Sequence, residues 1–308
     1  MSKKVLVATV KPFAKKAVDE IAKICRDTGY QLVLLESYSD ESEFLKAVAD
    51  VDALIIRSDK VNADVLEAAS NLKVVVRAGA GYDNVDLTKA TEKGIVVMNT
   101  PGQNSNAVAE LAFGMMLNLA RRHYTGKPGT ELKGKTLGIH AYGNVGLHVS
   151  RIAKGFGMEV YAFDPFVSAE KMKADGVTPL DSAEELYRTC DYISLHLPKM
   201  KETLGLVNYV LMSELKDDAA IINTARKEVV DEEGLLKMLA ERPNFRYASD
   251  IAPDRLEEVN ARFAERTFFT AKKMGAQTAE ANINAGIAAI TQIVNFFEKG
   301  DTTFQVNK

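Results

Sequence analysis

The sequence has little of several features that mark other classes of protein. It contains only two cysteines in 308 residues, so a disulfide framework is not expected, and the composition suits a reducing compartment such as the cytoplasm. Its apolar runs are no longer than a strand, which argues against a membrane span. The formal charge of −3 leaves no basic footprint for nucleic acid. Residues 1–4 lead directly into a strand-like segment, so no cleavable signal peptide is expected.

What the sequence does contain is a repeated alternation of short apolar strands and amphipathic helices. With 46% hydrophobic residues, the chain is long enough for about two domains with large cores. Strands buried on both faces and joined by helices indicate parallel sheets, so we expect an α/β fold of two doubly wound, Rossmann-like domains with a cleft between them. The expected strands are 3–10, 30–36, 51–57, 72–77, 95–99, one that opens the segment 136–146, 157–163, 191–197, 219–223 and 246–250.

A glycine-bearing turn at 136–146 predicts a dinucleotide site. A short apolar strand runs into this turn, Gly143 would let the backbone approach a pyrophosphate, and Gly146 would let the following helix pack on the strand. Ala141 replaces the first glycine of the usual pattern, and a turn of small residues that binds no nucleotide is the alternative interpretation. Asp164, 18 residues beyond Gly146, favours the dinucleotide site and indicates NAD, because a carboxylate there binds ribose hydroxyls and repels the additional phosphate of NADP. The turn residues expected at the cofactor are Tyr142, Gly143, Asn144, Val145 and Gly146.

The segment Asn104–His123 predicts a long helix that is apolar almost all round. A helix of this kind is stable only when it is buried on most sides. The sequence leaves two explanations open, a domain core or a subunit interface.

Several motifs in order along the chain resemble the D-2-hydroxyacid dehydrogenase family, especially short D-3-phosphoglycerate dehydrogenases without a C-terminal regulatory domain. These motifs are 57–58, 77–86, 99–110, the dinucleotide turn, 196–198, 223–226, Asp250 and 275–278. The resemblance implies a substrate-binding domain at 1–99 completed by 281–308, and an NAD-binding domain at 100–280. It also implies a homodimer formed through the helix near Asn104–His123.

The resemblance implies roles for residues at the ends of the second set of strands. Arg226 is expected to hold the substrate carboxylate, which a guanidinium can do with two parallel hydrogen bonds. Asp250 is expected to orient the nicotinamide amide. Four further residues are expected at the cofactor, of which His196 more plausibly lines the site than does chemistry: His196, Pro198, Thr224 and Ala225.

The chain departs from the family pattern at the acid/base pair. Lys273 stands where the family has a catalytic histidine, and Arg255 stands where it has the partner glutamate. In one interpretation Lys273 takes the hydroxyl proton and meets Arg226 across the cleft. Free lysine has a pKa of about 10.4, so burial together with Arg226 and Lys272 would have to lower it. In the other interpretation the site is inactive and the chain is an NAD-binding regulatory protein.

A small anionic 2-hydroxy acid is the expected substrate. Arg57 matches the position that contacts phosphate in phosphoglycerate dehydrogenases, and Arg77 or Lys60 could assist it. The sequence therefore predicts oxidation of 3-phospho-D-glycerate to 3-phosphooxypyruvate for serine synthesis. A glyoxylate, hydroxypyruvate or D-lactate dehydrogenase is the alternative. The complete set expected to bind substrate is Arg57, Ser58, Ala78, Gly79, Ala80 and Arg226, and no metal is expected.

Overall fold

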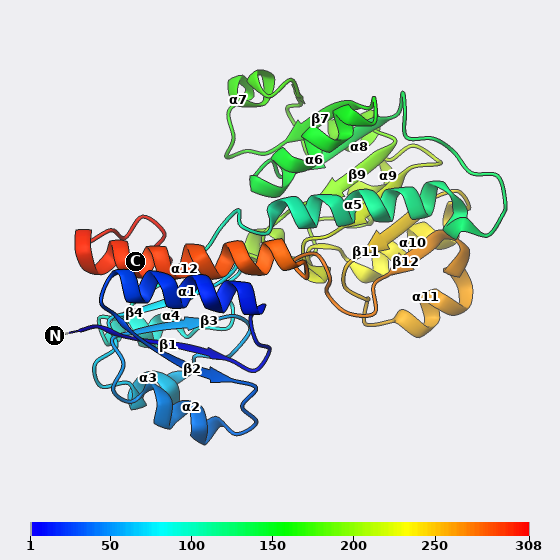
Figure 1. Ribbon diagram of the computed structural model, residues 1–308. Helices are drawn as coiled ribbons and strands as arrows, with labels where there is room; N and C mark the ends of the chain where they lie inside the picture. The colour runs from blue at the N-terminus through cyan, green and yellow to red at the C-terminus, as the bar shows by residue number, and fades with distance from the viewer. Residues whose placement is uncertain (1, 308) are drawn as a thin grey trace. The chain divides into compact units, whose positions relative to one another are not determined.

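The computed structural model describes residues 2–307 and divides the chain into two compact units. The first unit comprises Met1–Asn104 and Thr278–Lys308, and the second comprises Ser105–Gln277. Both are parallel-sheet α/β units, which confirms the predicted fold class. The helices are shown with the strands in Figure 1.

The first unit contains a five-stranded parallel sheet in the order β2-β1-β3-β4-β5. All four residues of β3 are buried, as expected for a central strand covered on both faces. The strand order reverses between β1 and β3, which is the position where open α/β sheets bind ligands at their carboxyl ends. The strands are β1 (Lys4–Thr9), β2 (Gln31–Glu36), β3 (Ala53–Ile56), β4 (Val74–Arg77) and β5 (Val96–Asn99).

Helices cover both faces of this sheet. One face packs against α1 and α12, which lie side by side (Figure 1) and contribute Ile21 and Ala289 to a shared core. The opposite face packs against α2, α3 and α4. As predicted, Asn62 caps α3, because its side chain accepts a hydrogen bond from Val65 N (3.0 Å). The helices are α1 (Lys15–Asp27), α2 (Glu41–Val48), α3 (Ala63–Ala68), α4 (Leu87–Glu92) and α12 (Ala279–Lys299).

The second unit contains a seven-stranded parallel sheet in the order β12-β11-β10-β9-β6-β7-β8. Its order reverses between β6 and β9, as in dinucleotide-binding folds. The strands are β6 (Thr136–His140), β7 (Glu159–Phe163), β8 (Thr178–Pro179), β9 (Tyr192–Leu195), β10 (Ala220–Asn223), β11 (Arg246–Ser249) and β12 (Thr267–Phe269). The helices are α5 (Ser105–Ala120), α6 (Asn144–Gly155), α7 (Ala169–Ala174), α8 (Ala183–Thr189), α9 (Tyr209–Ser213), α10 (Glu232–Glu241) and α11 (Leu256–Phe263).

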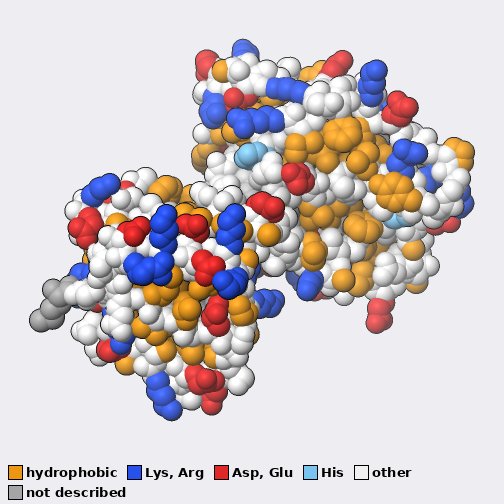
Figure 2. All heavy atoms as spheres, viewed as in Figure 1, with side chains coloured by type: hydrophobic (Ala, Val, Ile, Leu, Met, Phe, Trp, Pro, Cys, Tyr) orange, Lys and Arg blue, Asp and Glu red, His pale blue; other side chains and the backbone are white. Residues whose placement is uncertain are grey.

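Helix α5 is shorter than the sequence predicts. It ends at Ala120 rather than near His123, because residues 122–124 adopt positive φ angles that an α-helix cannot contain. Phe113, Met116 and other apolar residues of α5 are buried in the core, but residues 106, 110 and 114 are exposed. Apolar side chains gather on the surface over and beside α5 (Figure 2). Within the unit, α5 is therefore buried on one side only.

Both cysteines belong to the core, as predicted. Cys25 and Cys190 are buried and free. Burial raises the pKa of the Cys25 thiol to about 11 and that of Cys190 to about 12, so both stay protonated at neutral pH. From residue 2 to residue 307, no helix has both the length and the apolar character needed to cross a membrane.

Candidate functional site in the second unit

The carboxyl edge of the second sheet collects most of the predicted cofactor and catalytic residues. Because the strands are parallel, the segments that follow β6, β9, β10 and β11 emerge at the same edge. These segments carry the glycine turn, His196, Thr224–Arg226 and Asp250. The structure therefore brings together residues that are more than 100 positions apart in the sequence.

The turn after β6 has the geometry of a dinucleotide-binding turn. Gly143 is the N-cap residue of α6, and a Cβ added there would meet no atom within 4 Å, so the backbone is open to a close ligand. A Cβ at Gly146 would lie 2.8 Å from Ala141 O, which leaves room only for glycine. The helical ladder begins with Leu147 N donating to Gly143 O (3.0 Å), and the N–H groups before it lie at the helix N-terminus.

Two residues of this turn show features that the sequence alone did not indicate. Ala141 has φ 78°, a left-handed conformation that costs an L-residue about 1–2 kcal/mol. It occupies the place of the missing first glycine. Tyr142 is buried, and its hydroxyl lies 3.0 Å from Ser150 Oγ. The substitution of glycine by alanine thus leaves the turn conformation in place at a cost in strain.

Asp164 is tied to the turn by its carboxylate. Its Oδ2 accepts from Tyr142 N and its Oδ1 accepts from Phe166 N, each at 2.8 Å. These bonds hold the carboxylate at the end of β7, beside the glycine turn. An open helix N-terminus, an open Gly143 and a fixed acid together fit an NAD molecule with its pyrophosphate at α6 and its ribose at Asp164.

The turn after β10 brings two cations together. Arg226 Nη1 donates to Ala225 O at 3.0 Å, and Lys273 Nζ donates to the same oxygen at 3.3 Å. The two nitrogen atoms therefore cannot be farther apart than the sum of these distances. Both residues belong to the second unit, which corrects the expectation that they meet across a gap between domains. Lys273 is exposed on this unit, so the unit does not supply the burial that the sequence argument required.

Asn223 shapes this turn, a role that the sequence pattern did not indicate. Its Oδ1 accepts from Ala225 N (3.0 Å), and its Nδ2 donates to Arg226 O (2.9 Å). Asn223 is 1% exposed, and Tyr247 OH lies 3.2 Å from the same Nδ2. An asparagine that bonds to the backbone two residues ahead is typical of an Asx turn. That short-range pattern is the signal by which the role could have been predicted.

Asp250 is buried and holds the loop that carries Lys273. Its Oδ1 accepts from Met274 N (2.7 Å) and Thr270 Oγ1 (3.0 Å), and its Oδ2 accepts from Gly275 N (2.7 Å). A Cβ at Gly275 would lie 3.0 Å from Asp250 Oδ2, so glycine permits this approach. The carboxylate thus contacts the loop on both sides of Lys273.

The remaining expected cofactor residues lie near this edge. His196 Nε2 is 2.9 Å from Ser194 Oγ, and its Nδ1 is 3.5 Å from the hydroxyl of the buried Thr224. Burial, with a smaller contribution from His140, lowers the pKa of His196 to about 3, so the imidazole is neutral at pH 7. Pro198 is exposed, and its carbonyl accepts from Thr203 Oγ1 (2.6 Å). A neutral His196 suits a structural or binding role better than proton transfer.

Two cations near this edge are paired with acids. Arg255, at the position of the family's glutamate, donates from Nε to Glu258 Oε2 (2.8 Å). Lys227 pairs with Asp254. Across residues 2–307, no group of three histidine, cysteine, aspartate or glutamate side chains is placed to hold a metal ion.

In the first unit, the predicted substrate residues lie at the carboxyl ends of β3 and β4. Arg57 Nη1 donates to Lys11 O (2.9 Å) and Pro12 O (3.0 Å), and Nη2 donates to Asn282 Oδ1. Its guanidinium carbon lies 5.2 Å from the centre of the Phe13 ring. Burial lowers the pKa of Arg57, and Asp59 partly opposes that shift. Arg57 is therefore held in place by backbone and amide oxygens.

The glycine turn after β4 differs in part from the expectation. Ala78 N donates to Ile56 O (2.8 Å) in continuation of the sheet, so this N–H is not available to a carboxylate. Arg77 Nε donates to Arg57 O (2.9 Å), and a Cβ at Gly79 (φ 149°) would overlap the Arg77 guanidinium. Ser58 and Ala80 are exposed. The turn thus places Arg77 over Gly79, beside the Arg57 backbone.

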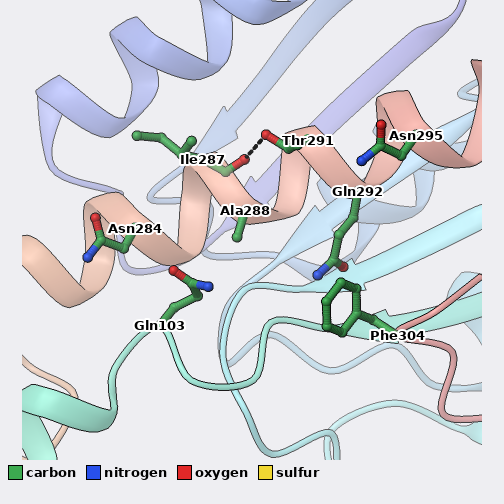
Figure 3. A pocket seen from close by; sticks show the side chains of 8 residues that line it. All are labelled: Gln103, Asn284, Ile287, Ala288, Thr291, Gln292, Asn295 and Phe304. Carbon is green, nitrogen blue, oxygen red and sulfur yellow. Dashed lines mark hydrogen bonds between the residues drawn. The ribbon is translucent and has the colours of Figure 1, made fainter. Parts of the chain in front are cut away.

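A separate hollow of about 280 Å³ lies on α12. Gln292 extends from α12 toward Phe304 (Figure 3), and its Nε2 donates to Asn99 O (3.0 Å), which ties α12 to β5. The side chains that line the hollow are amide, hydroxyl or apolar, so it does not fit an anionic acid. They are Gln103, Asn284, Ile287, Ala288, Thr291, Gln292, Asn295 and Phe304.

Comparison with known proteins agrees with this geometry. Residues 102–271 match the family model described as the NAD binding domain of D-isomer specific 2-hydroxyacid dehydrogenases. The chain belongs to this family. The family is one of NAD-dependent oxidoreductases, so NAD is the cofactor of the second unit.

The alignments with individual relatives span most of this chain. It is 38% identical to D-3-phosphoglycerate dehydrogenase of Rattus norvegicus over 299 residues, 92% of this chain and 56% of the relative. It is 35% identical to hydroxypyruvate reductase of Thermotoga maritima over 280 residues, 85% of this chain and 90% of the relative. The chain thus spans little more than half the length of the phosphoglycerate dehydrogenases of rat and other mammals that it matches.

A solved structure shows the same fold over the whole chain. The structure of NAD+-bound 3-phosphoglycerate dehydrogenase from Entamoeba histolytica superposes with a TM-score of 0.91 and 45% identity. The superposition covers 100% of this chain and 99% of that one. This family member therefore has the dehydrogenase fold from end to end.

Proposed function

We propose that this family member oxidises 3-phospho-D-glycerate to 3-phosphooxypyruvate with NAD, as a step of serine biosynthesis. The observation that carries the proposal is the convergence of Arg226 and Lys273 on Ala225 O, at the carboxyl end of β10. Oxidation of a 2-hydroxy acid releases a hydride from C2 and a proton from the hydroxyl group. Bound NAD accepts the hydride.

The residues of the chain then have two tasks. Arg226 holds the substrate carboxylate, because a guanidinium forms two parallel, charge-assisted hydrogen bonds with it. Lys273 takes the hydroxyl proton as an amine, a form that the positive charge of the neighbouring Arg226 favours in the absence of burial. It returns the proton as an ammonium group in the reverse direction. The shared Ala225 oxygen supports this division, since it keeps a fixed cation beside the proton acceptor. The Asp250 carboxylate orients the nicotinamide amide at the end of β11.

Recognition of the substrate phosphate is assigned to the first unit, which we propose to be the substrate-binding domain. Arg57 and Arg77 place two guanidinium groups at the carboxyl ends of β3 and β4, on the ligand-binding edge of that sheet. The names of the mammalian relatives and of the Entamoeba histolytica structure support phosphoglycerate as substrate. If Arg57 reads the phosphate, Arg57→Ala will lower kcat/KM for the phosphorylated acid at least tenfold more than for D-lactate or hydroxypyruvate. An equal loss on all of them rules out this assignment.

A second candidate is reduction of hydroxypyruvate. The Thermotoga maritima relative with that name is matched over 90% of its own length, against 56% for the rat phosphoglycerate dehydrogenase. Turnover measured with NAD or NADH on phosphoglycerate, hydroxypyruvate, glyoxylate and D-lactate separates these activities. A chain that binds NADH without turning over any of them would be an NAD-binding regulatory protein.

The acid/base assignment is tested at Lys273. Lys273→Ala should lower kcat at least 100-fold and leave the affinity for NADH within about threefold. Lys133→Ala, which removes an exposed lysine of the same unit just before β6, is the matched control and should retain turnover. Unchanged turnover in Lys273→Ala would exclude the lysine mechanism.

We also propose a homodimer formed through α5, in the cytoplasm. The partly exposed apolar side chains Leu111 and Leu117 on α5 support an interface there. Gly114 lies on the exposed side of α5, and a Cβ added there meets no atom within 4 Å. Gly114→Arg should therefore leave the protomer folded and turn a dimer into a monomer in light scattering. An equal molar mass for the parent and for Gly114→Arg would contradict this interface.

A further inference from the structure

We propose that Thr270 and Asp250 form a clamp that positions Lys273, and that Thr270 is a positioning residue for the reaction. This inference rests on the proposed function, because it concerns how the proton acceptor is held. Thr270 follows β12, and Lys273 lies in the loop between β12 and α12. The clamp is distinct from the contact that Asp250 is proposed to make with the nicotinamide amide.

The loop between β12 and α12 carries Lys273, which has a long and flexible side chain. Lys273 is exposed, and so are its neighbours Lys272 and Met274. A side chain with four rotatable bonds cannot present its amine at a fixed place unless the backbone beneath it is fixed. The structure fixes that backbone from one side, through the Asp250 carboxylate.

The Asp250 carboxylate accepts hydrogen bonds from the loop on the carboxyl side of Lys273. Met274 N and Gly275 N both donate to Asp250 at 2.7 Å, the short distance typical of hydrogen bonds to a charged acceptor. Gly275 also brings the loop against α5, since a Cβ there would lie 3.2 Å from Val108 Cγ2. The peptide that follows Lys273 is therefore anchored at two successive N–H groups.

Thr270 closes the clamp from the other end of the loop. Its hydroxyl donates to Asp250 Oδ1 at 3.0 Å, the same oxygen that accepts from Met274 N. The hydroxyl thus fixes the rotation of the carboxylate and ties the start of the loop to its end, with Lys273 between them. Asp250 itself is held by the sheet, because Asp250 N donates to Asn223 O (2.9 Å), and Asn223 shapes the turn of Arg226. One connected set of hydrogen bonds thereby sets the positions of both cations.

Thr270 is a better test of this device than Asp250, because Asp250 is also proposed to contact the cofactor. Thr270→Val removes the hydroxyl and keeps the shape, and Thr270→Ser restores the hydroxyl. Thr267→Val is the matched control, since Thr267 lies three residues earlier, in β12, and its hydroxyl donates to Phe263 O (3.1 Å), away from the loop. All variants are assayed as the complete chain, with NAD and 3-phospho-D-glycerate.

We expect Thr270→Val to lower kcat about tenfold, the effect of one hydrogen bond to a charged group, with KM for NAD within about twofold. Thr270→Ser should recover most of the loss, and Thr267→Val should stay within twofold of the parent. The Met274 and Gly275 amides should exchange hydrogen at least tenfold faster in Thr270→Val alone. Parental kcat and unchanged exchange in Thr270→Val, or a Thr270→Ser variant as slow as Thr270→Val, would overturn the proposal.

The Lys273→Ala background separates failure of the clamp from failure of the proposed function. There, Thr270→Val should cause no further loss of residual turnover, because the two residues act as one unit. A second tenfold loss would mean that Thr270 acts on something other than Lys273, and would refute the clamp. If Lys273→Ala keeps full turnover, the acid/base assignment fails, while faster loop exchange in Thr270→Val still establishes the anchoring.

Discussion

Gly146→Ala tests the packing on which the dinucleotide turn depends. A Cβ at this position would lie 2.8 Å from Ala141 O and 3.0 Å from Ile139 Cγ2. The nearer atom is a backbone oxygen, which cannot rotate away, so the start of α6 must move. Such overpacking costs about 1–3 kcal/mol, and the better helix propensity of alanine returns at most about 1 kcal/mol. We therefore expect a net loss of up to roughly 2 kcal/mol in the stability of the second unit when that full gain is returned.

Gly155→Ala provides the control, because Gly155 ends the same helix and an added Cβ there meets nothing within 4 Å. It should stabilise the helix by up to about 1 kcal/mol. A chain of two units need not unfold in one step, so both variants are compared by native-state hydrogen exchange of the β6 and α6 amides. Titration calorimetry with NAD should show weaker binding only for Gly146→Ala. Equal stability of the two variants within about 0.5 kcal/mol would refute the packing argument.

Three further predictions concern the same sheet. Gly143→Ala should cost less than about 1 kcal/mol of stability. It should weaken the affinity for NAD at least tenfold in calorimetry, because the added methyl group enters the open space assigned to the pyrophosphate. An unchanged affinity contradicts that assignment. Asp164→Asn keeps one acceptor oxygen for a backbone N–H and removes the negative charge. The ratio of kcat/KM for NADP to that for NAD should therefore rise about tenfold. A constant ratio would show that Asp164 does not determine the choice between the two cofactors. Burial lowers the pKa of His140 to about 4, with Asp164 partly opposing the shift. The unfolded chain, with a histidine pKa of about 6.5, binds the proton first as the pH falls. His140 should therefore contribute up to about 1.4 kcal/mol of lost stability per pH unit from about pH 6.5 down to 4, in addition to the contribution of His196. His140→Leu should reduce the slope of stability against pH measured by hydrogen exchange, and an identical slope in both proteins would contradict the prediction.

Local patterns in the sequence were sufficient to predict the fold class and most of the strands, but they did not indicate the edge strands β8 and β12. Short apolar strands alternating with amphipathic helices specify buried parallel sheets, because both faces of each strand must be covered. The N-cap of α3 at Asn62 and the place of the glycine turn follow from side-chain chemistry within a few residues. The end of α5 was less predictable, since the backbone turns to positive φ at 122–124 in residues with ordinary helix propensity.

Tertiary structure alone decided how the site residues are held. Ala225 O lies between Arg226 and Lys273 because β10 and β12 end at the same edge of the sheet. The spacing of these residues along the sequence does not predict that contact. Asp250 was expected only at the cofactor, whereas its carboxylate also accepts three hydrogen bonds from a loop about 20 residues away. The sequence determined which groups are present and in which element each lies, because those depend on neighbours along the chain. Which groups share an oxygen depends on contacts between distant segments, and these exist only once the sheet has formed.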